Sequence, residues 1–318
     1  MNQRSPYHPG ERAIQARLGV RQRIEEVGRR IIRDHMPEQH RAFYRQLPLF
    51  FVGSAGDDLR PWASALHGPP GFVQSPDPRH LRVRARPIAG DPLAENLRDG
   101  AAIGGLGLEF HTRRRNRVNG KATLDADGGG FTLEVDQSFG NCPQYINTRR
   151  APQSSIETTA GRATVAHRGE TLDARERAII AAADTFFIAS RYVEDAADPA
   201  HGIDVSHRGG LPGFVELRGS RRLVWPDFRG NFAFNTLGNI LLDPRAGLLF
   251  VDFASGATIQ MTGAAEILWT FESANPAHAG AQRMIVFDIE SVLRIDDALP
   301  PGWEFLTYAP QFAQETGQ

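Results

Sequence analysis

Short apolar runs separated by turn residues dominate the sequence after about residue 45. Leu49–Val52 and Phe186–Ala189 are two such runs, and each is followed by a segment rich in turn-forming residues. The apolar runs on either side of Gly219-Ser220 and of Ser255-Gly256 predict two hairpins. Several short strands at this spacing are typical of a small barrel. The pattern therefore predicts a mainly β fold with flanking helices.

Helical periodicity is confined to a few segments. Apolar residues between Val20 and Ile31 recur at i, i+4, i+7 and i+11, which predicts one apolar stripe on an Arg-rich helix. This helix would be an arm packed on its own barrel or on a partner; the alternative is a membrane-surface or calmodulin-binding helix. Leu172–Ala183 and Asn235–Leu242 predict two further helices, the second ended by Asp243-Pro244.

The chain also repeats itself over a long period. Ser64, Pro70–Val73 and Leu81 recur 142 residues later, and Gly104, Phe110 and Gly120 recur 143 residues later. The second members of these pairs are Ser206, Pro212–Val215, Leu223, Gly247, Phe253 and Gly263. An ordered series with a slowly drifting offset indicates two homologous units, each a domain because the period is too long for a solenoid.

The repeat sets the predicted domain organisation. An N-terminal helical arm (1–36) is followed by a first unit (37–150), an interdomain linker (151–170), a second unit (171–298) and a C-terminal tail (299–318). Both units are predicted to be β-barrels of the same kind, with Met284–Phe287 and Val292–Ile295 adding one or two closing strands to the second.

Composition and charge exclude several functions. The 318 residues include 36 basic and 37 acidic side chains, a net charge of −1, which argues against a dedicated nucleic-acid binder. The single cysteine, Cys142, excludes an intrachain disulfide framework, and the ten isolated histidines predict no metal site. We expect Cys142 to be a buried, inert thiol rather than a nucleophile. Without an 18-residue apolar run or a signal-like segment, the predicted location is cytoplasmic, with no membrane contact.

Candidate chemistry gathers in two segments of the second unit. Trp225–Ile240 combines Asn, Asp, Thr and Gly with aromatic residues between a strand and a helix, which suits a phosphate and a flat ring. The alternative is a helix cap and turn. Asp204–Gly210 adds Ser206, His207 and Arg208, of which the arginine could bind a phosphate or be a solvated turn residue.

One segment of the first unit is strongly basic. His111–Gly120 contains Arg113, Arg114, Arg115 and Arg117, and it corresponds to Ala254–Gly263 of the second unit. A solvated edge strand, an anion or cofactor-phosphate site and a nucleic-acid patch all remain open.

At this point the second unit resembles the pyridoxamine 5′-phosphate oxidase-like family of FMN-binding split barrels. The resemblance covers about residues 178–298 and rests on Asp204–Gly210, Pro212–Val215, Trp225–Asn231, Asn235–Ile240 and Pro244–Phe250. The first unit matches through Pro61–Ser64, Pro69–Val73 and Ser138–Pro143. The arrangement is similar to the tandem flavoproteins of that family, so the expected fold class is two tandem split β-barrels.

The resemblance implies an FMN held in the groove between two barrels, which form an internal pseudo-dimer or, in two chains, a homodimer. It implies FMN ligands from both units and a first pseudo-site that has degenerated. The implied ligands are Ser206, His207, Arg208, Trp225, Pro226, Asp227, Gly230, Asn231, Asn235, Thr236, Asn239 and Gln260, with Arg115 and Arg117 as the first unit's equivalents of Gln260. No catalytic residue is assigned; His207 is the best candidate because of its titration range.

The sequence also departs from the family. Gly302–Leu306 lacks the family's substrate-phosphate motif, which argues against pyridoxal phosphate synthesis, and Gly238 replaces an Arg found in many relatives. Arg208 or Arg229 would then supply the phosphate contact. The implied function is an FMN-dependent oxidoreductase of a small-molecule redox substrate, with a flavin or ferredoxin reductase as the candidate partner. The alternatives are a non-catalytic flavin- or nucleotide-binding module acting with a separate reductase, and FAD, haem or a deazaflavin in place of FMN.

Overall fold

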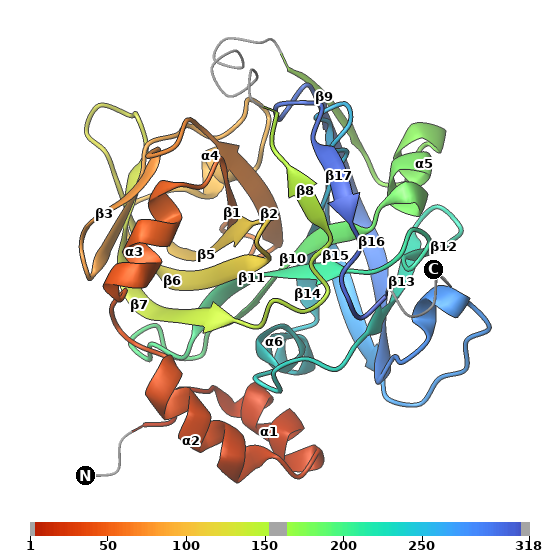
Figure 1. The fold of residues 1–318 in the computed structure, drawn as a ribbon, viewed down its shortest axis with the longest axis horizontal. Helices are drawn as coiled ribbons and strands as arrows, with labels where there is room; N and C mark the ends of the chain where they lie inside the picture. The colour runs from red at the N-terminus through yellow and green to blue at the C-terminus, as the bar shows by residue number, and fades with distance from the viewer. Residues whose placement is uncertain (1–3, 153–163, 313–318) are drawn as a thin grey trace.

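The computed structural model describes residues 4–152 and 164–312, and within these ranges it is built mainly from antiparallel strands (Figure 1). The predicted fold class is confirmed: the chain is mainly β and forms two tandem split barrels with flanking helices. Each barrel is formed by one large sheet, and each sheet packs its apolar side chains around a separate core.

The first sheet contains seven strands in the order β2-β1-β5-β6-β7-β4-β3. Its strands are β1 (Leu49–Ala55), β2 (Pro61–His67), β3 (Val73–Asp77), β4 (His80–Val83), β5 (Ala102–Glu109), β6 (Arg114–Leu124) and β7 (Phe131–Asn141). β6 is therefore paired on both sides, by β5 and β7. The expected alternative of a solvated edge strand at His111–Gly120 is wrong, because this segment runs through the middle of the sheet.

The second sheet contains eight strands, seven of them in the order β11-β10-β14-β15-β16-β13-β12. Its strands are β10 (Thr185–Tyr192), β11 (Gly202–Gly209), β12 (Glu216–Arg218), β13 (Arg222–Asp227), β14 (Arg245–Val251), β15 (Thr258–Leu268) and β16 (Arg283–Asp296), with β9 (Val165–Gly169) paired to β16. One long strand, β16, spans the two closing segments predicted at 284–287 and 292–295.

The two sheets follow the same path, strand for strand. Ser64 and Ser206 lie on the equivalent strands β2 and β11, and Gly104 and Gly247 lie on β5 and β14. Both sheets also contain a register shift at the same place, immediately before Gly120 in β6 and before Gly263 in β15. A Cβ atom at either glycine would lie about 2 Å from a carbonyl oxygen of the next strand, so only glycine fits at these bulges.

The two barrels pack against each other through equivalent strands. Strands β1, β2 and β5 of the first contact β10, β11 and β14 of the second. A third apolar core fills this interface and includes Phe51, Leu106, Phe187 and Leu249. The backbones approach closely in a symmetric manner: a Cβ at Gly104 would meet the Ile203 carbonyl oxygen at 2.5 Å, and one at Gly247 would meet the Pro61 carbonyl oxygen at 2.3 Å.

The helices lie around the two barrels. They are α1 (Pro9–Arg17), α2 (Arg21–Ile31), α3 (Glu38–Arg45), α4 (Leu93–Asn96), α5 (Ala174–Ala182), α6 (Asn235–Leu242) and the short 3₁₀ helix η1 (Pro276–His278). In Figure 1, α1 and α2 lie together beneath α6. The predicted single apolar stripe is wrong in part: Ile24 is buried, but Val27 and Ile31 are 40% and 37% exposed.

Both predicted irregular segments contain some regular structure. Residues 153–163 of the expected linker lie outside the described residues, whereas Val165–Gly169 of the same segment form β9. In the expected tail, β17 (Glu304–Thr307) pairs with β8 (Thr148–Arg150), and residues 313–318 lie outside the described part. The exact boundaries of the two units stay a prediction.

Candidate functional site

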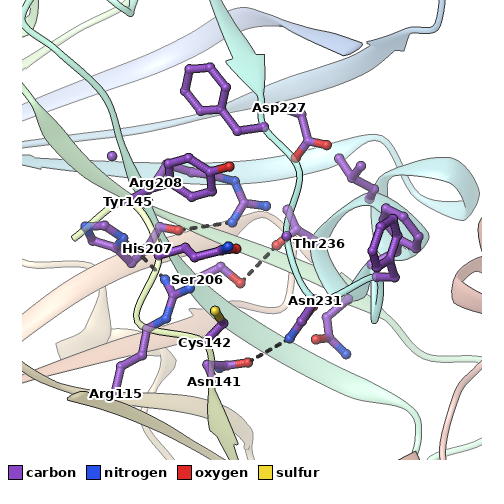
Figure 2. Close-up of a pocket in the computed structure, with 18 of the residues that line it drawn as sticks. Arg115, Asn141, Cys142, Tyr145, Ser206, His207, Arg208, Asp227, Asn231 and Thr236 are labelled. Atoms are coloured by element: carbon purple, nitrogen blue, oxygen red, sulfur yellow. Dashed lines mark hydrogen bonds between the residues drawn. The ribbon is translucent and has the colours of Figure 1, made fainter. Parts of the chain in front are cut away.

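A pocket lies where the two barrels meet, and residues of both barrels line it (Figure 2). Its empty space amounts to about 910 Å³, a figure that includes open solvent at its mouth. Of the fourteen predicted FMN ligands, eleven line this interbarrel pocket. They are Arg115, Arg117, Ser206, His207, Arg208, Pro226, Asp227, Gly230, Asn231, Asn235 and Thr236.

Three arginines converge on the pocket from two strands. Arg115 and Arg117 extend from β6 of the first barrel, and Arg208 extends from β11 of the second. Arg117 forms an ion pair with the buried Asp204 at 2.8 Å and also donates to the Ser206 hydroxyl. The Thr236 hydroxyl, at the start of α6, lies 3.0 Å from the same Ser206 oxygen.

The other two guanidiniums have no carboxylate partner among the described residues. Arg115 donates to His207 Nδ1 at 3.3 Å, and Arg208 donates to the His207 backbone carbonyl at 3.1 Å. The nearby Asp227 is paired instead with Arg283, at 2.9 Å. Burial, followed by the neighbouring Arg208 and Arg117, lowers the pKa of Arg115. Burial likewise lowers the pKa of Arg208, against the raising effect of the nearby Asp227 carboxylate. An anion in the pocket would relieve this concentration of positive charge.

His207 is held in its neutral form. Its pKa is lowered well below the usual value, first by burial and then by Arg115, Arg208 and Arg149. Because a guanidinium can only donate, Nδ1 of His207 accepts the bond from Arg115, and the neutral ring carries its proton on Nε2. No described residue hydrogen-bonds that Nε2 atom. His207 therefore orients Arg115 at neutral pH and does not act there as a cationic acid.

Aromatic side chains form the other part of the pocket wall. The rings of Tyr145 and Phe228 stack at 5.1 Å between centroids, and those of Phe232 and Phe234 meet edge to face at 6.0 Å. Tyr145, Phe232 and Phe234 all have left-handed backbones, with φ values of 63°, 63° and 64°. Such φ values are unusual for bulky residues, each costing about 1–3 kcal/mol, and they cluster at functional sites.

Three predicted ligands lie elsewhere. Strand alternation turns Trp225 into the core of the second barrel, where its ring meets that of Phe186. Asn239 lies one turn further along α6, where it donates to Ser190 and to Asp204, at 3.1 Å and 3.2 Å. It lines a separate cavity with about 690 Å³ of empty space including open solvent, whose wall also includes Glu11 and Asn235. Asn239 therefore supports Asp204 from behind the pocket.

Gln260 lies on the opposite side of the barrel interface. Register and offset make it the equivalent of Arg117, because Leu249 pairs with Gln260 as Leu106 pairs with Arg117. Of the two predicted equivalents of Gln260, only Arg117 therefore matches it. Arg115 lies two residues earlier on β6 and corresponds to Thr258, so that part of the prediction is wrong. Gln260 does not line the interbarrel pocket.

The position equivalent to the pocket is closed. Gln260 donates to the Ala63 carbonyl at 3.0 Å and to Ser64 and Asp91, both at 3.1 Å, and Ser64 donates to Asp91 at 2.6 Å. All of these side chains are buried. Where the pocket has His207, Arg208 and Arg115, this position has Ala65, Leu66 and Thr258. The cationic side chains are thus confined to one of the two equivalent positions.

Sequence reasoning did not assign a role in the pocket to the end of β7 and the segment after it. Asn141, Cys142, Gln144 and Tyr145 of the first barrel line the pocket beside residues of the second. Asn141 accepts a hydrogen bond from Asn231 at 3.3 Å (Figure 2). The Tyr145 hydroxyl donates to the Arg229 carbonyl at 2.9 Å. Ser138–Pro143 is one of the segments through which the first unit resembles the split-barrel family, and this resemblance could have pointed to the segment as part of the site. Cys142, expected to be buried, is only partly so.

No family model and no curated protein matches this sequence. The solved structures that resemble it are split-barrel folds. Among them, HupZ from Group A Streptococcus is 12% identical, with a TM-score of 0.30, and the match covers 41% of this chain and 99% of that one. A candidate pyridoxamine 5′-phosphate oxidase from Lactobacillus delbrueckii is 14% identical (TM-score 0.30; 39% and 94% covered). An FAD-binding protein from Mesorhizobium loti is 12% identical (TM-score 0.25; 41% and 98% covered).

Two further properties concern the described residues only. No helix among them is both long and apolar enough to span a bilayer. Within 4–152 and 164–312, no three or more His, Cys, Asp or Glu side chains are grouped so that they could hold a metal ion.

Proposed function

We propose that the chain binds FMN in the interbarrel pocket and acts as an FMN-dependent oxidoreductase. Arg115 and Arg208, with the hydroxyls of Ser206 and Thr236, would hold the phosphate. Tyr145, Phe228, Phe232 and Phe234 offer aromatic faces to a flat ring system. The donor set and the ring set lie in one pocket, which is what a phosphorylated flavin requires.

The observation that carries the proposal is the pair of guanidiniums without carboxylate partners, Arg115 and Arg208. Partly buried cations are expected to have an opposite charge nearby, and the carboxylates around the pocket are already engaged with Arg117 and Arg283. The Nε atoms of Arg115 and Arg117 are also buried without a hydrogen-bond partner among the described residues. This unsatisfied donor capacity fits a phosphate that arrives with the ligand.

When bound, the flavin supplies the hydride and electron transfer, and this chain's residues bind it, orient it and limit its contact with water. The neutral His207 holds Arg115 toward the phosphate. Because Gly302–Leu306 lacks a substrate-phosphate motif, the proposed substrate is a small redox-active molecule other than a vitamin B6 phosphate.

The alternative is a flavin- or nucleotide-binding module that works with a separate reductase, such as a flavin or ferredoxin reductase. One observation favours it: the Nδ1 lone pair of His207 accepts from Arg115 and Asp227 is paired with Arg283, so neither side chain is free to take up a proton in the pocket. Both candidates share the same ligand site, and turnover separates them.

The asymmetry between the two equivalent positions further suggests one ligand for each chain. The closed position has no cation in place of Arg115 or Arg208, and a polar network fills it. The internal pseudo-dimer would therefore behave as a single-site protein.

The test compares FMN with riboflavin, which lacks the phosphate. If the arginines hold the phosphate, the purified protein should bind FMN with one site and bind riboflavin at least about tenfold more weakly, since charged hydrogen bonds contribute about 1.5–3 kcal/mol. Titration followed by flavin absorbance and fluorescence gives both affinities and the stoichiometry. Equal affinity for the two, or a protein that stays colourless with FMN, overturns the proposal. Anaerobic mixing of the FMN form with reduced nicotinamide then tells an oxidoreductase from a binding module.

A further inference from the structure

The part of the N-terminal arm that contains α1 and α2, residues 5–32, lies beside α6 (Figure 1). It contacts Phe232 and Asn235, which line the interbarrel pocket. Tyr7 and Ile24 of the arm form a small apolar cluster with Ala233, and Phe232 packs against this cluster. Arg17 of α1 lies over the ring of Trp269 at 3.9 Å, which fastens the arm to the second barrel. The segment 228–235 therefore lies between the arm and the pocket.

Gln15 contacts this segment at its most strained point. Its Nε2 atom donates to the Ala233 carbonyl at 3.1 Å, and both side chains are buried. Ala233 lies between Phe232 and Phe234, the two residues with left-handed backbones. The hydrogen bond therefore fixes the peptide that connects two unfavourable conformations, which would otherwise have reason to relax.

Glu11 contacts the next residues along the chain. Its carboxyl accepts a hydrogen bond from the Asn235 side chain, and it also accepts one from the His8 backbone at 2.8 Å, so that it caps α1. Asn235 lines both the pocket and the cavity behind it, so it is part of the wall between the two. The helices α1 and α6 can approach this closely because Gly10 and Gly238 face each other: a Cβ at Gly10 would lie 2.1 Å from the Gly238 carbonyl oxygen.

We infer that the arm is part of the ligand site, with Gln15 and Glu11 as positioning residues that hold residues 232–235 in the conformation that binds the ligand. The identity of the ligand rests on the function proposed above; the holding of the segment does not. The same packing requires glycine at position 238, because a Cβ there would lie 2.5 Å from the Glu11 backbone nitrogen.

The first measurement is hydrogen exchange in the ligand-free, full-length protein. Gln15→Met removes the donor at nearly constant length, and Gln22→Met makes the same change at an exposed position of α2. We expect faster amide exchange across residues 231–236 in Gln15→Met only, with exchange in β14 and β15 unchanged in both variants. A loss of global stability alone would instead raise exchange throughout the barrels.

The second measurement is the FMN dissociation constant of the same proteins. Loss of one neutral hydrogen bond should weaken FMN binding by about three- to tenfold in Gln15→Met, with Gln22→Met at the wild-type value. Glu11→Met, which removes the acceptor of the Asn235 hydrogen bond at similar length, should also weaken FMN binding by about three- to tenfold, with Glu26→Met at an exposed position of α2 at the wild-type value.

The outcomes separate the two proposals. If the wild-type protein does not bind FMN but Gln15→Met still exchanges faster at 231–236, the proposed function fails and the holding role of the arm stands. If exchange at 231–236 matches the Gln22→Met control, the inference is overturned. It is also overturned if exchange rises while the FMN affinity of Gln15→Met stays at the wild-type value.

Discussion

The rings of Phe51 and Phe187 stack at 3.6 Å between centroids, with 16° between their planes, at the centre of the contact between the two barrels. The two residues hold the same place in β1 and β10, so each barrel contributes the same side chain to the stack. This is the arrangement expected where a pseudo-twofold axis passes between equivalent strands. The pocket and the closed position lie on either side of this interface.

The stack predicts energetic coupling between the barrels. Phe51→Ala and Phe187→Ala should each lower the free energy of unfolding by about 3–5 kcal/mol. The double variant should lose about 0.5–1.5 kcal/mol less than the sum, because the pair's own interaction is removed only once. Urea unfolding of the four proteins gives the coupling. Phe187→Ala combined with Phe131→Ala, in the core of the first barrel, serves as the control and should be additive.

Removal of a guanidinium without a carboxylate partner should weaken FMN binding strongly. Arg208→Ala and Arg115→Ala each remove a charged donor from the pocket, and we expect affinity to fall by about 10- to 150-fold. Arg114→Ala is the matched control, because Arg114 is exposed on the neighbouring position of β6 and lies over Phe43 rather than in the pocket. Riboflavin affinity should change little in any of these variants. An equal loss for FMN and riboflavin would mean that the arginines do not contact the phosphate.

Asp91 in the closed position should make stability depend on pH. Burial raises its pKa from 3.8 to about 6, against the lowering effect of hydrogen bonds from Ser64, the Leu93 amide and Gln260. Because the folded pKa is the higher one, this stabilising contribution is fully present below pH 4 and is lost as pH rises through about 6. The stability of Asp91→Asn relative to wild type should therefore rise by up to roughly 3 kcal/mol between pH 4 and pH 7–8.

The measurement for Asp91 is the difference in unfolding free energy between the two proteins from pH 4 to pH 8. Taking the difference removes the opposite trend of His8, whose pKa burial lowers to about 4 and which destabilises the fold as pH falls. A difference that does not change with pH would show that Asp91 keeps its ordinary pKa in the folded protein.

The close approach of α1 and α6 predicts intolerance of a single methyl group. Gly10→Ala places Cβ 2.1 Å from the Gly238 carbonyl oxygen, so the helices must separate, which should lower the free energy of unfolding by about 1–3 kcal/mol. Gly169→Ala in β9 is the control, because the nearest atom to its Cβ would lie at 3.6 Å. Thermal unfolding of both variants checks the difference. A wild-type melting temperature for Gly10→Ala would mean that the arm packs less tightly than the structure indicates.

Much of the fold could be predicted from the sequence because the repeat shows the same order of strands in two segments of the chain. Asn235–Leu242 was predicted as a helix and is α6 with those bounds. The apolar periodicity between Val20 and Ile31 could not show how much of the apolar stripe is buried. Only part of it is, because the arm packs on a loop rather than on the face of a sheet. The basic segment in β6 was also ambiguous, because its neighbours β5 and β7 are fixed only by the tertiary pairing.

The site was harder to predict than the fold for a geometric reason. Apart from Arg115 and Arg117, sequence reasoning gathered residues of the second unit. The pocket is formed across the interface, so Tyr145 and Cys142 of the first barrel lie beside residues that are distant in the chain. The same symmetry placed Gln260 opposite Arg117 rather than beside it. A sequence motif cannot show which of the two equivalent positions a residue faces, because the strands at the two positions have the same local structure.

The joining of both barrels in one chain has a consequence for how the two positions can change. In a dimer of identical chains, replacement of Arg208 by an apolar residue would alter both binding positions at once. Here Leu66 occupies the equivalent place while Arg208 is retained. Each position can therefore change separately. One position can keep its ligand-binding residues while the other forms a polar contact between the barrels, in which Gln260 donates to Ser64 and Asp91.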